Sequence, residues 1–178
     1  MVSERLQADI SVSHDDWVSA IADVENVCQR AALATFGACA ERKLTKVEIS
    51  ILLSDDENLR VLNKKYRGID KPTNVLSFSN LEENETAQSE AMPLLLGDIV
   101  IAYETTLIEA EQEGKKLADH LSHLIIHGIL HLLGHDHENH AQAILMESLE
   151  TSTLAELGIT DPYNGTELMD QDDGLGSS

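Results

Sequence analysis

Hydrophobic and polar residues alternate along short segments of the chain, and this two-residue period is typical of β-strands. The second of these segments begins with alternation and then becomes wholly apolar, which predicts a strand in the middle of a sheet with both faces covered. The expected strands are residues 8–13, 46–54, 73–78 and 94–103.

Between and after these strands, apolar residues recur at the three- and four-residue spacing of helices. We expect a first helix opened by His14–Asp16, with its apolar face running from Trp17 to Ala31. A second helix starts at Ser54–Glu57, a capping signal, and is broken by Lys71-Pro72. The remaining helices are expected at residues 104–112, 117–133 and about 141–157, with Gly114, Gly134 and Gly158 as helix boundaries.

Strands interspersed with helices predict an α+β fold with a small four-stranded mixed sheet and about five helices. The length of 178 residues suits one domain with a real core. We assign that domain to residues 1–168, with an acidic loop at about 81–92, and we expect a flexible acidic tail at residues 169–178.

Histidines supply the chemistry, since seven of the eight lie between residues 120 and 140. His127 and His131 are four residues apart on a predicted helix, so both imidazoles project from one face and can meet one tetrahedral ion. Gly134 lets the chain turn back and carry His135 or His137 to a third position, and we favour His137 because the longer excursion gives room to close the site. Three neutral ligands leave a fourth position for water, which predicts one catalytic zinc ion per chain.

A histidine on an apolar helix face is often a hydrogen-bonded core residue, which is the alternative interpretation. Here apolar neighbours such as Ile126 and Leu130 would make unpaired imidazoles expensive to bury, which favours metal binding. We expect His120 and His123 to lie outside the ligand set and His140 to be exposed. A zinc metalloprotease carries Glu after the first histidine, whereas this chain has Gly128, so ordinary peptide hydrolysis is the weaker hypothesis.

The net charge of −20, from 12 basic and 32 acidic residues, gives no general attraction to phosphate backbones. Any nucleic-acid role must therefore use a local basic site or a protein partner. No apolar run approaches the ~20 residues of a membrane span, and the first residues lack the features of a signal peptide. Cys28 and Cys39 have no CxxC spacing and are expected to be buried thiols, so we expect a reduced, cytoplasmic protein.

The segment HGILHLLGHDH (127–137) resembles the signature of the YbeY family of bacterial metal-dependent endoribonucleases, also called rRNA maturation factors. The similarity continues through LNKKYRGIDKPTNVLSFS (62–79), LLGDIVIA (95–102) and LGITDPY (157–163). Two positions depart from the family pattern: many members carry Tyr where this chain has His135, and members often have Pro where it has Ser79.

The resemblance implies an α+β fold with a zincin-like metal helix, metal ligands at His127, His131 and His137, and an important arginine at Arg67. It also implies a role in 16S rRNA 3′-end processing, 70S ribosome quality control and stress tolerance. The expected partners are rRNA and the small ribosomal subunit, reached by docking on a ribosomal protein, with no DNA and no membrane.

Phosphodiester cleavage needs an activated oxygen and a group that stabilises charge on the phosphate. Zinc can lower the pKa of its water to ~7, and Arg67 can pair bidentately with phosphate oxygens. Alternatively, Arg67 caps its helix or pairs with Asp70. The general base is left open among Asp98, Asp136 and Glu147. Besides a single-strand-specific endoribonuclease, an assembly factor with a mainly structural metal and an atypical metalloprotease stay possible.

Overall fold

The computed structural model describes residues 5–39, 46–80, 94–136 and 138–159. The predicted acidic loop and acidic tail lie outside these residues, as does His137. None of the described helices is long and apolar enough to span a membrane. The elements, in chain order, are β1 (Leu6–Val12), α2 (Asp16–Ala20), α3 (Val24–Cys39), β2 (Val47–Ser54), α4 (Asp56–Arg67), β3 (Val75–Ser79), β4 (Leu94–Ala102), α6 (Tyr103–Gln112), α7 (Leu117–Leu132) and α8 (His140–Glu156).

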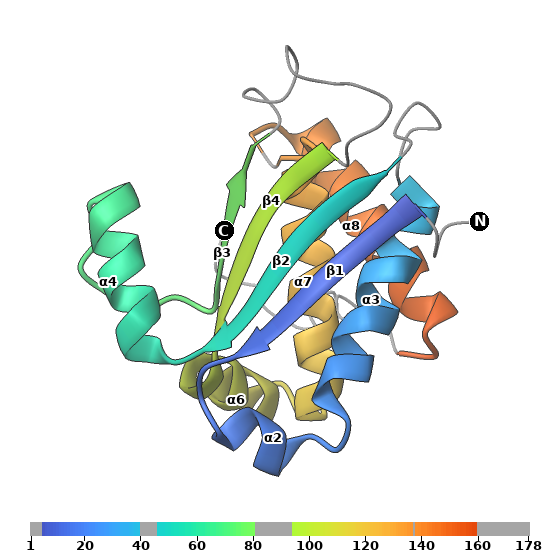
Figure 1. The fold of residues 1–178 in the computed structure, drawn as a ribbon. Helices are drawn as coiled ribbons and strands as arrows, with labels where there is room; N and C mark the ends of the chain where they lie inside the picture. The colour runs from blue at the N-terminus through green and yellow to red at the C-terminus, as the bar shows by residue number, and fades with distance from the viewer. Residues whose placement is uncertain (1–4, 40–45, 81–93, 137, 160–178) are drawn as a thin grey trace, which may run out of the picture.

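The strands form one mixed sheet in the order β1-β2-β4-β3, which confirms the predicted α+β class. β1, β2 and β4 run parallel, and β3 pairs antiparallel with β4 at one edge of the sheet. Figure 1 shows α3, α7 and α8 behind the sheet, α4 beside its front face, and α2 and α6 at the end where the parallel strands finish.

Successive residues of β4 face opposite sides of the sheet, and each side has its own core. Ile99 and Ile101 belong to the main core, which the sheet shares with α3, α7 and α8. Val100 and Ala102 belong to a smaller core together with Leu59 of α4. The sheet therefore separates α7 from α4, a relation that places the predicted histidines and Arg67 on different faces.

The N-terminal helical region differs from its prediction, because it contains two helices instead of one. Ile21 adopts an extended conformation (φ −124°, ψ 115°), and Asp23 has a φ of +55°, so the backbone cannot continue as one helix. Trp17 and Val24 are still buried, as their helical spacing predicted. This break brings the number of helices in the described residues to six, one more than expected.

The ends of α4 follow local capping rules. At its start, the side chain of Asp55 accepts a hydrogen bond of 2.8 Å from the backbone N–H of Asn58, which confirms the predicted capping signal. The helix ends at Arg67, before the predicted break at Lys71-Pro72, because Gly68 adopts the left-handed conformation (φ +72°) that terminates helices.

The start of α4 is also tied to the start of α6. The Asp56 carboxylate accepts hydrogen bonds from the backbone N–H and the hydroxyl of Thr105, and the Glu104 carboxylate accepts one from the Asp56 backbone N–H. Each helix thus caps the other, which fixes the direction in which α4 leaves the sheet.

Candidate metal centre

His127 and His131 lie one turn apart near the C-terminal end of α7, as their spacing predicted. Their Nε2 atoms are 3.0 Å apart, and their rings are nearly perpendicular with centroids 4.5 Å apart. Two nitrogens at 2.0–2.1 Å from a tetrahedral zinc ion would be separated by about 3.3 Å. The pair therefore converges on one point and needs a shift of only a few tenths of an ångström to hold an ion.

A carboxylate from α8 orients His127, one member of this pair. Glu150 is only 1% exposed, and its Oε1 accepts a hydrogen bond of 2.6 Å from Nδ1–H of His127. Its second oxygen, Oε2, accepts a 3.0 Å hydrogen bond from Nε2–H of His123. With its proton on Nδ1, His127 presents a lone pair on Nε2, which is the form of imidazole that binds metals.

Gly128, between the two histidines, packs closely against the sheet. A Cβ atom added there would lie 3.0 Å from Ile99 Cδ1 and 3.1 Å from Ser77 Oγ, closer than side chains normally pack. A glutamate at this position would have to enter the core between α7, β3 and β4. The fold therefore leaves no room for the carboxylate that serves a metalloprotease as general base.

His137, the third ligand predicted from the sequence, lies outside the described residues. Within the described ranges, no three His, Cys, Asp or Glu side chains form a group that could hold a metal ion. His135 is among the described residues and is partly buried, and it forms no such group with His127 and His131.

The other histidines of α7 form a row leading away from the pair. His123 contacts Glu150, and His120, 4% exposed, donates a 2.9 Å hydrogen bond from Nε2–H to Oε1 of Glu109 on α6. Burial alone would raise the pKa of Glu109, but hydrogen bonds from His120 and Asn74 outweigh it, so the pKa is lowered. His120 thus joins α7 to α6, and Glu109 in turn accepts hydrogen bonds from Asn74, the residue before β3. His140 is exposed at the start of α8, as expected.

Arg67 occupies the last turn of α4 and is exposed. In the part of the chain that the structure describes, no hydrogen bond or ion pair involves its guanidinium. Asp70, the alternative partner considered from the sequence, instead accepts a 2.8 Å hydrogen bond from Nε–H of Arg60. This hydrogen bond lowers the pKa of Asp70. Arg67 is therefore available to bind an anion.

A model of the family described as endoribonuclease YbeY matches residues 9–158. The chain belongs to this family. A YbeY endoribonuclease of Paramagnetospirillum magneticum is 49% identical over 147 residues, covering 83% of this chain and 89% of the relative. Another, from Rhodopseudomonas palustris strain BisA53, is 46% identical over 164 residues, covering 92% and 94%.

The YbeY membership agrees with the fold found here. The solution structure of a Thermotoga maritima protein matches with a TM-score of 0.54 at 19% identity, covering 94% of this chain and 96% of that one. At this identity the match supports the fold alone.

The three carboxylates considered as general bases are all exposed. Asp98 is exposed on β4 and pairs in register with Phe78, on the sheet face opposite Ile99 and α7. Asp136 is exposed just after α7, and Glu147 is exposed on α8. The buried carboxylate that contacts a predicted ligand is Glu150, which sequence reasoning missed. A signal existed: Glu150 follows Met146 by four residues on the buried face of the predicted helix.

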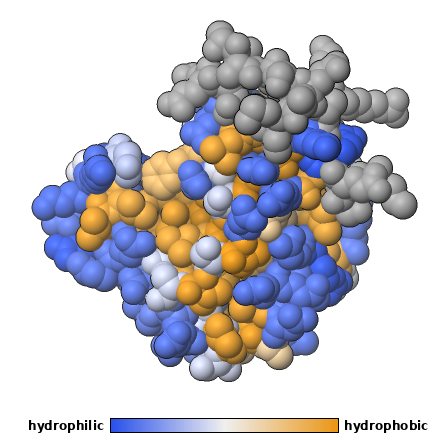
Figure 2. Space-filling model, in the orientation of Figure 1, coloured by the Kyte–Doolittle hydropathy of each residue, from blue (hydrophilic) through white to orange (hydrophobic). Residues whose placement is uncertain are grey.

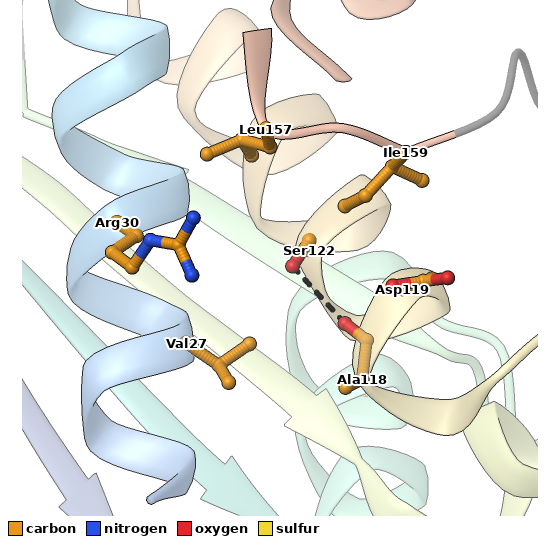
Figure 3. A pocket seen from close by; sticks show the side chains of 7 residues that line it. All are labelled: Val27, Arg30, Ala118, Asp119, Ser122, Leu157 and Ile159. Carbon is orange, nitrogen blue, oxygen red and sulfur yellow. Dashed lines mark hydrogen bonds between the residues drawn. The ribbon is translucent and has the colours of Figure 1, made fainter. Parts of the chain in front are cut away.

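A separate small pocket lies between α3, α7 and the residues after α8. Its volume is about 170 Å³, and Val27, Ala118, Leu157 and Ile159 give it apolar walls. Figure 3 shows Arg30 extending from α3 toward this pocket and the Ser122 hydroxyl hydrogen-bonded to the Ala118 carbonyl. Neither His127 nor His131, the predicted metal ligands that the structure describes, lines this pocket.

Proposed function

We propose that this chain is a zinc-dependent endoribonuclease specific for single-stranded RNA. The proposed site holds one zinc ion through His127, His131 and His137. The observation that carries the proposal is the converging His127–His131 pair, oriented by the buried carboxylate of Glu150. The chain also belongs to a family of endoribonucleases.

The residues proposed to take part in the reaction lie on the two faces of the sheet. A bound zinc ion would supply Lewis acidity and a water molecule with a pKa of ~7. His127 is held by Glu150 in the tautomer that carries its proton on Nδ1, so that the lone pair of Nε2 could bind a metal. Arg67, on the other face, would bind phosphate oxygens bidentately and stabilise the negative charge that develops during cleavage.

The proposed substrate is ribosomal RNA, with a role in 16S rRNA 3′-end maturation and ribosome quality control in the cytoplasm. The charge of −20 opposes binding to free RNA. We therefore propose that a ribosomal protein of the small subunit docks the enzyme. The same charge is the observation that favours the second candidate, an assembly factor whose metal is mainly structural.

Cleavage of a defined structured RNA by zinc-loaded protein tests the proposal. We expect the wild type to cleave it and to contain one zinc ion per chain by elemental analysis. His131→Ala should lose both, because it removes one of the converging nitrogens. His140→Ala is the matched control, since His140 is exposed and outside the proposed ligand set. Cleavage that survives in His131→Ala protein would overturn the zinc mechanism. Zinc binding without cleavage by the wild type would favour the assembly factor.

A further inference from the structure

Tyr66 is an exposed aromatic residue next to Arg67. Its exposure is 58%, and it is the one aromatic side chain among the large hydrophobic residues found exposed in the described part of the chain. Trp17 and Phe36, by contrast, are fully buried. Single exposed hydrophobic residues are common on protein surfaces, so a binding role for Tyr66 has to follow from its surroundings.

The Tyr66 ring packs against a second aromatic ring and lies close to a lysine. Its centroid lies 5.0 Å from that of Phe78 on β3, and Nζ of Lys65 lies 5.1 Å from the Tyr66 centroid. Phe78 is itself half-buried against the smaller core. Because Phe78 is anchored in the sheet, it fixes the position of the tyrosine while more than half of Tyr66 stays open to solvent.

The surroundings of Tyr66 combine positive charge with apolar surface. Residues 60–71 contain five of the twelve basic residues in this acidic chain, namely Arg60, Lys64, Lys65, Arg67 and Lys71. The partly buried Leu52, Leu62 and Phe78 border the smaller core beneath α4. Figure 2 shows hydrophobic atoms reaching the surface on this side of the molecule, between hydrophilic margins. An aromatic ring beside cations is how single-stranded nucleic acids are held without sequence preference.

The edge strand β3 connects this surface to the metal pair. Phe78 faces α4 and contacts Tyr66, whereas the neighbouring Ser77 faces α7, where its Oγ lies 3.1 Å from a Cβ built on Gly128. Gly128 in turn lies between His127 and His131. Since β3 is at the edge of the sheet and contacts both helices, α4 with Tyr66 and α7 with the histidine pair lie against the same edge strand.

We propose that Tyr66, backed by Phe78, is a platform on which an unpaired RNA base stacks while Arg67 and the neighbouring lysines bind phosphates. This inference rests on the proposed function and assigns its preference for single strands to a residue. A base in a duplex has both faces covered by its neighbours, so it cannot stack on Tyr66. An unpaired base can, and the adjacent Arg67 is placed to bind the backbone of the same strand.

Equilibrium binding to the zinc-loaded full chain tests the platform. The probe is a fluorescent single-stranded oligonucleotide of 2′-O-methyl RNA, checked for integrity afterwards, with its duplex as a second probe. Tyr66→Ala should weaken single-strand binding about tenfold or more, the usual effect of losing one stacked base. Tyr66→Phe should bind within about twofold of wild type, because the ring is kept, whereas Tyr66→Leu should resemble Tyr66→Ala. Duplex binding should be the same for all four proteins.

Two controls separate stacking from a merely structural role. Val61→Ala removes another exposed apolar side chain from α4 and should bind the single strand like wild type. An oligonucleotide with abasic sites throughout should bind wild type and Tyr66→Ala equally, because the base that stacks is missing. Equal losses on the single-stranded, duplex and abasic probes would overturn the platform and point to α4 as a docking site for protein. Unchanged single-strand binding by Tyr66→Ala would overturn it too.

The outcome is independent of the test of the proposed function. If wild type cleaves RNA and Tyr66→Ala binds single strands normally, the platform falls and the endoribonuclease stands. If no RNA is cleaved but binding depends on both Tyr66 and the base, the endoribonuclease falls and the platform stands.

Discussion

Replacing Glu150 by Gln changes one atom at the buried carboxylate that holds His127. Glu150 accepts two hydrogen bonds, from Nδ1–H of His127 and Nε2–H of His123. A glutamine has one acceptor and one donor at these positions, so it satisfies both rings only if one of them moves its proton to its other nitrogen. If His127 is that ring, its Nε2 becomes protonated and can no longer bind a metal.

The size of the effect follows from this competition. Changing a carboxylate that orients a ligating histidine typically weakens metal binding 10- to 100-fold, or about 1.4–2.7 kcal/mol. Glu147→Gln is the matched control, since it makes the same change one turn earlier on α8 at an exposed residue. Zinc affinity can be measured by competition with a chromogenic chelator. Zinc should also raise the thermal stability of Glu150→Gln less than that of Glu147→Gln.

Equal zinc affinity in the two folded variants would refute the reasoning. In that case the hydrogen bond of 2.6 Å from His127 to Glu150 would have no influence on the metal, and the carboxylate would serve packing between α7 and α8 alone. Glu150→Asp gives a further check, because its shorter side chain keeps the charge but cannot span both imidazoles, so it should also bind zinc more weakly than wild type.

Other predictions address the packing, the charge and the acid response. Gly128→Glu should destabilise the protein strongly and Gly128→Ala mildly, by about 1–2 kcal/mol, because overpacking against Ile99 and Ser77 exceeds the gain in helix propensity. Thermal unfolding measures the stability of both variants, and an unchanged midpoint for Gly128→Glu would contradict the close packing. Arg67→Ala should keep fold and zinc content but lose cleavage, and Arg67→Lys should recover only part because an ammonium cannot bind bidentately; full activity of Arg67→Ala would remove the phosphate role. The lowered pKa of Glu109 means that its ionised form stabilises the fold at pH values above its unfolded pKa of ~4.3, and this stabilisation is lost as the pH falls through the lower folded value. Wild type should therefore exceed Glu109→Gln in stability at neutral pH and approach it on acidification, as measured by urea unfolding; a constant difference would argue against the linkage. Burial raises the pKa of the Cys28 thiol to about 12, so thiol reagents at pH 8 should modify Cys28 only after unfolding.

Features governed by short sequence separations could be predicted. The strands follow from alternation, the start of α4 from its cap, and the His127–His131 pair from a four-residue spacing on one helix. Each of these depends on backbone geometry within one element. The break between α2 and α3 is also local, but it depends on the positive φ of Asp23, which the apolar spacing of Trp17 and Val24 does not reveal.

Features that depend on packing between elements could not be predicted. Glu150 contacts His127 because α8 packs on α7. Arg60 donates a hydrogen bond to Asp70 because the chain turns back after Gly68. Asp98 was considered a general base from its residue type alone. The register of β4 shows where it lies: Ile99 contacts α7, so the neighbouring Asp98 faces the other side of the sheet, where α4 packs.

The packing of Gly128 has a consequence for the chemistry as a whole. In a zincin protease, one helix supplies two ligands and the general base, so the base is held in place by the helix itself. Here α7 is too close to β3 and β4 to carry that base. The other charged groups of the proposed site come from other elements: Glu150 of α8 contacts His127, and Arg67 lies in the last turn of α4, which packs on the other face of the sheet. A cation beside an edge strand would suit a polyanionic strand that passes over that edge, because a guanidinium can pair with phosphate oxygens.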